Sequence, residues 1–242
     1  RGRLPWVATS AQINGDEVVL SGTKPYCIAS GGADGFIVSA RTSGDAQDKE
    51  GVGLFLVPAD AAGLSANTWH LADGSVATSL TLNKVRIPAG NRLGGGIEAI
   101  DEVEVLAALA RSAEALGIME RLFGETIDYL RTRDQFGAPL GSFQAIQHRM
   151  VTQYAAIEQS RALLNLALVS WDTDQFESAV YGARAYIAEH SLTLGHEMIQ
   201  FHGGMGVTDE LTIGGGHKRL LVLSRWPESP QAALDRYAGL LN

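Results

Sequence analysis

Two short stretches of the sequence combine residue types that could hold an anion. In residues 129–147 (YLRTRDQFGAPLGSFQAIQ), Arg133 precedes an aromatic residue and a turn that contains Gly137. An arginine fork suits bidentate contact with a phosphate, and Phe136 could pack against a ring or a core. The same spacing fits an ordinary helix end, where arginine favours the last turn and Gly137 supplies a left-handed cap. The residues alone leave both interpretations open.

The second stretch, residues 200–210 (QFHGGMGVTDE), closes a later predicted helix. Glycines such as Gly203 and Gly204 let a backbone approach a ligand closely, but they also simply end helices. Thr208 or Asp209 could then cap the next helix. This stretch is therefore as ambiguous as the first when it is taken alone.

Metal and nucleophile chemistry find no support in the sequence. The histidines do not pair at the spacing of zinc ligands, and no Gly-x-Ser-x-Gly elbow occurs. The acidic pairs at residues 101–102 and 209–210 lie at predicted helix starts, where the helix macrodipole explains them. Cys27 is the single cysteine, so no internal disulfide can form. We interpret it as a small buried apolar residue and expect a cytoplasmic protein.

Composition restricts the partners. The 242 residues carry a net charge of −8, with a pI of about 5.2 and no basic run, which argues against nucleic acid and anionic membranes as partners. No uncharged run approaches the roughly 20 residues that a membrane helix needs. The sequence does not begin with Met, and we expect that something upstream is missing or processed away.

Residues 1–95 carry a β pattern. Short apolar runs alternate with turn signals, among which Asn14-Gly15-Asp16 strongly indicates a hairpin. Residues 45–50 are charged and predict an exposed hairpin loop. About six short strands at this spacing suggest a small barrel or sandwich. The runs that we take as strands are residues 6–8, 18–20, 36–40, 54–57 and 80–87.

Residues 96–242 carry a helical period after a glycine-rich boundary at residues 94–96. Helices are predicted from residue 97 to about 131, from a Ser142 cap to about 171, from about 174 to 201, from near 209, and from near Pro230. Long helices joined by short loops are typical of an antiparallel four-helix-type bundle. In the first helix, the residues that recur at helical spacing are Val103, Leu106, Ala110, Ala113 and Gly117. The predicted class is α+β.

Together, in this order and at this separation, the two stretches resemble the acyl-CoA dehydrogenase family. The shared pattern is RxQFG-x-P-L followed by FQ-x-I-Q, a helical pair, and Q-x-HGG-x-G-x-T-x-E. The resemblance covers nearly the whole chain, with LSGTK in the middle β domain. The ending DEL-x-IGGGHKRL is similar to that of a bacterial subgroup whose members often work as pairs of unlike subunits on lipid or sterol side chains. The family's N-terminal helical domain is absent from this sequence.

The resemblance implies FAD between the β and helical domains, reaching into a second subunit of a homo- or hetero-oligomer, a dimer or a tetramer. A glutamate would take the α-proton of an acyl-CoA, and the flavin would take hydride from the β-carbon. The product would be a trans-2-enoyl-CoA, and electron-transferring flavoprotein would accept the electrons. Carried onto matching positions, the cofactor-binding residues would be Arg133, Gln135, Phe136, Gln144, Gln200, Gly203, Gly204 and Tyr26.

Three departures from the family pattern bear on catalysis. Ile28 stands where a hydroxyl usually bonds the flavin, and one family position for the base falls near Ala107. The other falls at the start of the last helix, where Glu228 lies within one residue of it. Glu228 is therefore the candidate base, although a glutamate also simply favours a helix N-terminus. Two functions remain: a dehydrogenase with Glu228 as base, or a non-catalytic subunit that completes the FAD site of an unlike chain.

Overall fold

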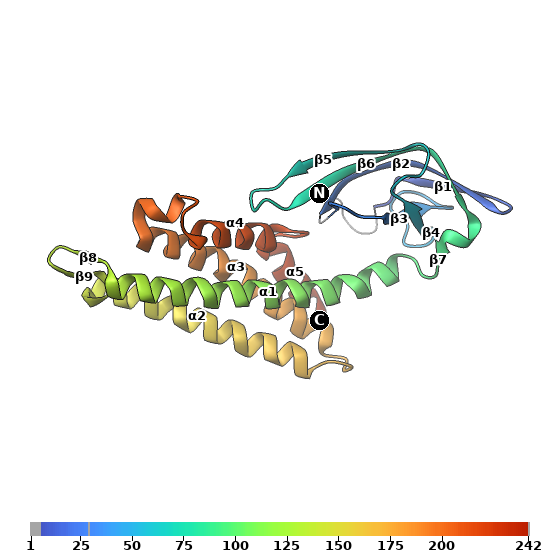
Figure 1. Cartoon of the computed structure of the whole chain (residues 1–242). Helices are drawn as coiled ribbons and strands as arrows, with labels where there is room; N and C mark the ends of the chain where they lie inside the picture. The colour runs from blue at the N-terminus through green and yellow to red at the C-terminus, as the bar shows by residue number, and fades with distance from the viewer. Residues whose placement is uncertain (1–5, 29, 242) are drawn as a thin grey trace. The chain divides into compact units, whose positions relative to one another are not determined.

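The computed structural model describes residues 6–28 and 30–241, which form a β-sheet unit followed by a helical unit (Figure 1). The compact units are residues 1–103 and 104–242, so the first turns of the long helix α1 belong to the first unit. The predicted α+β class, with a β region followed by a helical bundle, is confirmed.

The first unit holds one seven-stranded sheet in the order β5-β6-β2-β1-β3-β4-β7. Its β1 and β3 are parallel and share only the pair Ser10 and Arg41, so the sheet is weakly joined at that point. Apolar side chains from both parts of the sheet, including Leu20, Phe55 and Val85, form one buried cluster. The strands are β1 (Ser10–Asn14), β2 (Glu17–Ile28), β3 (Gly35–Arg41), β4 (Val52–Pro58), β5 (Leu64–His70), β6 (Val76–Pro88) and β7 (Arg92–Leu93).

Both predicted hairpin loops are confirmed. β1 and β2 pair antiparallel across a two-residue turn in which Gly15 has φ +61°. Residues 42–51 connect β3 to β4. The buried Arg41 holds this exposed loop by donating to the backbone carbonyls of Ser43, Ala46, Asp48 and Glu50, and it also donates to the Val7 carbonyl outside the loop. The prediction of a strand at residues 6–8 is wrong, because β1 begins at Ser10, and β5 was not predicted.

The second unit packs its helices antiparallel around one apolar core. Met119, Ile157, Ile187 and Leu220, one from each of the first four helices, are almost fully buried in it. In Figure 1, α1, α2 and α3 run side by side along the unit. The helices are α1 (Ile97–Thr132), α2 (Gln144–Val169), α3 (Phe176–His202), α4 (Thr212–Arg225) and α5 (Pro230–Leu240).

Three helix-level expectations are wrong. Neither Thr208 nor Asp209 caps α4, because this helix begins after Leu211. The predicted apolar face of α1, including Val103 and Leu106, is exposed in this chain, whereas Ala108, Met119 and Leu122 are buried. The predicted Ser142 cap also fails, because α2 begins after Phe143 and the Ser142 hydroxyl donates to the carbonyl of Pro139. Small alanines on several faces of α1 made its buried side ambiguous in the sequence.

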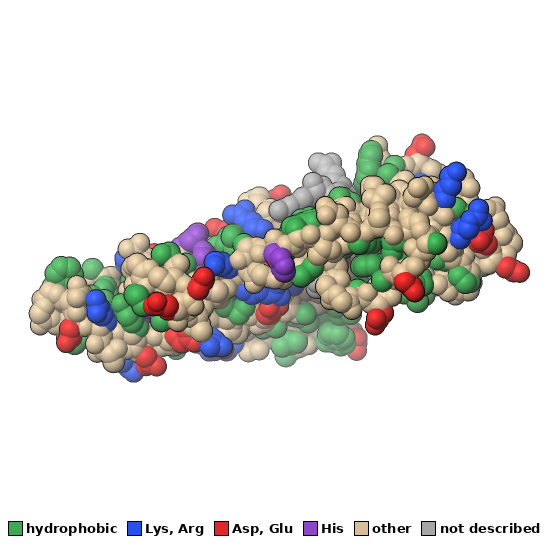
Figure 2. All heavy atoms as spheres, turned by 45° about the horizontal axis from the view of Figure 1, so that its top comes forward, with side chains coloured by type: hydrophobic (Ala, Val, Ile, Leu, Met, Phe, Trp, Pro, Cys, Tyr) green, Lys and Arg blue, Asp and Glu red, His purple; other side chains and the backbone are tan. Residues whose placement is uncertain are grey.

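None of the described helices is both long and apolar enough to cross a membrane. On the face drawn in Figure 2, basic and acidic side chains are interspersed.

Candidate functional site

The Arg133 stretch forms a small hairpin directly after α1. β8 (Asp134–Gln135) and β9 (Ala138–Pro139) pair across a turn in which Phe136 has φ +56° and Gly137 has φ +81°. The amide of Leu140 closes the hairpin base by donating to the Arg133 carbonyl at 2.8 Å. The interpretation of Gly137 as the cap of α1 is therefore wrong, since the helix ends at Thr132 and Gly137 serves the hairpin turn.

The glycine stretch does end a helix, and it also leaves its backbone open. Gly203 is the C-cap of α3 with φ +58°, and its N–H donates to the carbonyl of Gln200. Residues 203–207 continue as a short 3-10 turn, η3. A Cβ atom added at Gly203 or Gly204 would meet nothing within 4 Å, so the backbone of both glycines borders open space. The two interpretations of this stretch are compatible, because the residues that end the helix also present bare backbone.

The two stretches meet at one hollow of about 440 Å³ in the helical unit. Five of the predicted cofactor-binding residues line it. The Arg133 side chain is exposed and has no hydrogen-bond or ion-pair partner among the described residues. The full lining is Tyr129, Arg133, Gln135, Leu140, Gln200, Phe201, His202, Gly203, Gly204 and Met205.

Two residues that the sequence reasoning missed brace this hollow. The rings of Tyr129 and His202 stack at 4.3 Å, which joins the end of α1 to the end of α3. His202 is buried, and its Nδ1 lies 2.8 Å from the Met198 carbonyl. Because a carbonyl oxygen only accepts hydrogen bonds, Nδ1 is the ring nitrogen that donates. Arg149 lies over the ring of Phe201 at 4.7 Å and is paired with Glu197 by two hydrogen bonds. Arg149 is thus already paired with Glu197. Among the described residues, Arg133 is the arginine at this hollow whose guanidinium has no partner.

The donor set of the hollow fits the diphosphate of a dinucleotide. A free guanidinium can bind phosphate oxygens with two parallel hydrogen bonds, and the Gln135 and Gln200 amides can add neutral ones. Glycine at 203 and 204 removes the side chains that would keep a ligand off the backbone. These residues could hold FAD.

The remaining predicted cofactor contacts lie elsewhere. Phe136 is 90 % exposed at the hairpin tip and meets Phe143 edge-on at 6.2 Å. Gln144 is exposed at the first position of α2. Tyr26 belongs to the β-sheet unit, where its ring lies 5.7 Å from that of Trp69. None of these three lines the hollow at Arg133.

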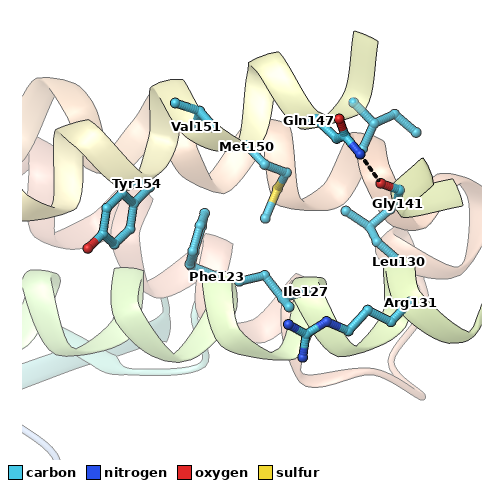
Figure 3. A pocket seen from close by; sticks show the side chains of 10 residues that line it. Phe123, Ile127, Leu130, Arg131, Gly141, Gln147, Met150, Val151 and Tyr154 are labelled. Atoms are coloured by element: carbon cyan, nitrogen blue, oxygen red, sulfur yellow. Dashed lines mark hydrogen bonds between the residues drawn. The ribbon is translucent and has the colours of Figure 1, made fainter. Parts of the chain in front are cut away.

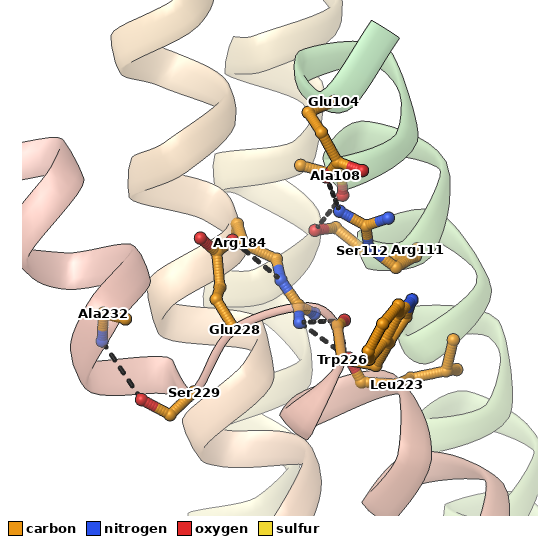
Figure 4. A network of polar contacts seen from close by, with 10 residues as sticks. All are labelled: Glu104, Ala108, Arg111, Ser112, Arg184, Leu223, Trp226, Glu228, Ser229 and Ala232. Atoms are coloured by element: carbon orange, nitrogen blue, oxygen red, sulfur yellow. Dashed lines mark hydrogen bonds and ion pairs between the residues drawn. The ribbon is translucent and has the colours of Figure 1, made fainter. Parts of the chain in front are cut away.

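Glu228 sits in a charged cluster inside the helical unit rather than on an exposed helix end (Figure 4). Its Oε1 lies 4.0 Å from Nε of Arg184, and its side chain is 21 % exposed. Burial raises the pKa of this carboxyl above its ordinary value, while Arg184 acts in the opposite direction. Ser229 provides the cap of α5 by accepting from the Ala232 amide. A role for Glu228 at the helix N-terminus is therefore not needed, because the next residue fills it.

In the β-sheet unit, the titratable side chains of Lys24 and Cys27 lie near each other. Lys24 donates to the Ser39 hydroxyl at 2.9 Å, and burial lowers its pKa to about 8. The nearby Cys27 is half-buried, whereas the sequence predicted a buried residue, and burial raises the pKa of its thiol.

A second hollow of about 450 Å³ lies between α1 and α2 and is mostly apolar (Figure 3). Phe123, Ile127, Met150 and Tyr154 line it, with Arg131 at its edge. No group of His, Cys, Asp or Glu that could hold a metal ion occurs among residues 6–28 and 30–241.

Comparison with known proteins identifies the class to which this fold and site belong. Residues 94–226 match the family described as acyl-CoA dehydrogenase, C-terminal domain, which is more than half of the chain. The chain belongs to the acyl-CoA dehydrogenase family.

Individual relatives agree with this assignment. The chain is 30% identical to cyclohexane-1-carbonyl-CoA dehydrogenase of Geobacter metallireducens over 86% of its own length and 56% of the relative's. It is 31% identical to acyl-CoA dehydrogenase FadE27 of Mycobacterium tuberculosis over 78% and 51%. It also matches a solved structure of the ChsE4-ChsE5 complex from the same organism, with 27% identity and a TM-score of 0.88 over 99% of this chain and 64% of that one. The chain thus spans about half the length of the curated relatives it matches.

Proposed function

We propose that this chain takes part in the α,β-dehydrogenation of an acyl-CoA thioester to a trans-2-enoyl-CoA, as one subunit of an FAD-containing oligomer. The observation that carries the proposal is the meeting of Arg133, Gln135, Gln200, Gly203 and Gly204 at one hollow, in a chain of this family. These residues lie up to 71 positions apart in the sequence, yet they present matching donors and bare backbone together.

In the proposed site, Arg133 holds the pyrophosphate of FAD, and Gln135 and Gln200 fix its orientation with neutral hydrogen bonds. Gly203 and Gly204 let the adenosine end approach the backbone. FAD, when bound, supplies the acceptor for the hydride that leaves the β-carbon. Phe136, Gln144 and Tyr26 would contact FAD from outside this hollow, as the family pattern suggests.

Glu228 is the proposed base. Its carboxylate takes the α-proton while the β-carbon loses hydride, so the two C–H bonds break and one C=C bond forms. A base works best when its pKa lies near the working pH, and the partial burial that raises the pKa of Glu228 moves it in that direction. Two electrons then leave for an external acceptor, for which we propose electron-transferring flavoprotein.

Association with another subunit is supported by apolar side chains that this chain leaves exposed along α2. Val151, Tyr154, Leu166 and Val169 are each at least half exposed, and Val151 and Tyr154 border the apolar hollow of Figure 3. A run of exposed apolar side chains on one helix is typical of a protein interface. Homo- and hetero-oligomers, dimeric or tetrameric, are both compatible with this surface.

The alternative is a non-catalytic subunit that completes the FAD site of an unlike chain. Similarity to one chain of the ChsE4-ChsE5 complex favours it, as does the contact of Glu228 with Arg184, which could serve structure alone. In this case the chain would lend Arg133 and the 200–204 wall to a cofactor that its partner holds.

The experiment that separates the two is Glu228→Gln in the purified complex, with intact masses and flavin absorbance per chain measured beside turnover. If Glu228 is the base, the variant keeps FAD and loses about 10²-fold to 10⁴-fold in turnover. Full activity in Glu228→Gln would exclude this base. Stoichiometric flavin and dehydrogenase activity in the chain purified by itself would exclude the partner function.

A further inference from the structure

We infer that Arg184 is a positioning residue for Glu228: its guanidinium anchors the segment that carries Glu228 and faces the carboxylate. The inference rests on the proposed function of Glu228 as base. The Arg184 side chain is 0 % exposed, and a buried arginine requires compensating partners around its charge.

One end of the guanidinium fixes the backbone. Nη2 of Arg184 donates to the Leu223 carbonyl at 2.6 Å and to the Trp226 carbonyl at 3.2 Å. Leu223 lies in the last turn of α4, where carbonyls lack helical partners and a cation is favoured. Trp226 follows the helix and leads directly into Glu228. A single side chain from α3 therefore holds both the end of α4 and the start of the segment to α5.

The other side of the guanidinium faces the carboxylate. Nε lies 4.0 Å from Oε1 of Glu228, too far for a hydrogen bond but close enough for a direct charge interaction. Neither Nε nor Nη1 has a hydrogen-bond partner among the described residues. A small movement of Glu228 toward Arg184 would satisfy Nε, whereas a movement away would release the carboxylate toward a substrate.

The other charges around Glu228 have partners of their own. On α1, Arg111 pairs with Glu104 at 3.0 Å. On α5, Arg236 pairs with Glu177 at 2.9 Å.

Tyr181 on α3, which lies under the Arg236 guanidinium, also faces this cluster, and burial raises its pKa to about 12, so that it stays neutral. Arg184 makes no other ion pair among the described residues, and Glu228 is its counter-ion.

Two substitutions distinguish the effect of the positive charge of Arg184 from that of its planar guanidinium, which donates several hydrogen bonds. Arg184→Gln removes the cation and should raise the pKa of the Glu228 carboxyl by about one to three units, the usual effect of an opposite charge at this distance. Arg184→Lys keeps the cation but cannot reach both backbone carbonyls and the carboxylate, so kcat should fall about 10²-fold through misplacement of the base. Arg161→Lys, at an exposed arginine that pairs with Glu120 and Glu158, is the matched control and should change neither quantity.

The measurement is a pH titration of the full complex labelled with 13C at the glutamate carboxyl, with the Glu228 signal assigned by its loss in Glu228→Gln. The pH profile of kcat/KM is recorded for the same samples. An unchanged Glu228 pKa in Arg184→Gln, or an unchanged kcat in Arg184→Lys, would overturn the inference. If the Glu228 pKa shifts in Arg184→Gln but Glu228→Gln keeps full turnover, the interaction between Arg184 and Glu228 is supported and Glu228 is excluded as the base.

A second readout leaves the buried arginine intact. In the otherwise unmodified chain, the Nε–H resonance of Arg184 should follow the ionisation of Glu228, and in Glu228→Gln it should not respond over the same pH range. An Arg184 resonance that ignores Glu228 would refute the inference even if the arginine variants fail to fold.

Discussion

The sharpest test of the proposed cofactor site is Arg133→Gln. The Arg133 guanidinium is exposed and has no partner among the described residues, so its loss removes no contact within this chain. Surface changes of this kind alter the free energy of unfolding by about 0.5 kcal/mol or less. An effect of Arg133→Gln on FAD binding would therefore report a contact with the cofactor.

The expected loss follows from the contact that an arginine makes with a phosphate. A hydrogen bond to a charged group contributes about 1.5 to 3 kcal/mol. Since 1.4 kcal/mol is a factor of ten, the Kd for FAD should rise about 10-fold to 150-fold. Arg133→Lys keeps the charge without the planar fork, so it should fall between the wild type and Arg133→Gln.

The assay is titration of the flavin-depleted complex with FAD, followed by quenching of flavin fluorescence, beside thermal unfolding of the apo form. The matched control is Arg131→Gln. Arg131 is also an exposed arginine, two residues earlier; its guanidinium lies 3.9 Å from the Asp128 carboxylate and borders the apolar hollow instead. An unchanged Kd for FAD in Arg133→Gln, or an equal rise in Arg131→Gln, would refute the assignment of Arg133 to the cofactor.

Three further predictions test other parts of the structure. Gly204→Val should weaken FAD binding more than Gly204→Ala does, because the larger side chain keeps the cofactor farther from the backbone. The stability of the apo protein should not fall in Gly204→Ala, since a Cβ atom at this position meets nothing within 4 Å. Equal FAD binding in both variants would speak against close backbone approach. Arg41→Met should lower the free energy of unfolding in urea by about 3 kcal/mol or more, because five carbonyls lose their buried donor, whereas Arg86→Met at an exposed ion pair should change it little. The pKa of Lys24 is lowered from 10.5 to about 8, so between these pH values the unfolded chain binds the extra proton and folding gains stability as pH rises. The wild type should therefore gain stability relative to Lys24→Met from pH 8 to 10.5 in denaturant titrations, and a constant difference would contradict the burial of this amine.

Local patterns predicted the elements well, because a turn or a helical period is encoded within a few neighbouring residues. The hairpin at Gly15, the loop at residues 42–51 and the long helix α1 all follow from such patterns. Prediction failed where several local solutions were nearly equal in energy. Alanines on several faces left the buried side of α1 undetermined, and the RDQFG stretch could either end a helix or turn a hairpin.

The sequence by itself determined the family, through the order and separation of its two motifs, and it named five of the residues that line the hollow at Arg133. Only the tertiary structure decided that Tyr129 and His202 brace this hollow, and that Glu228 faces a fully buried Arg184. Arg184 reaches carbonyls 39 and 42 residues away, and no local pattern records such a contact. Its position depends on how α3 and α4 pack, and this packing turns a glutamate near a helix start into a candidate base with a counter-ion.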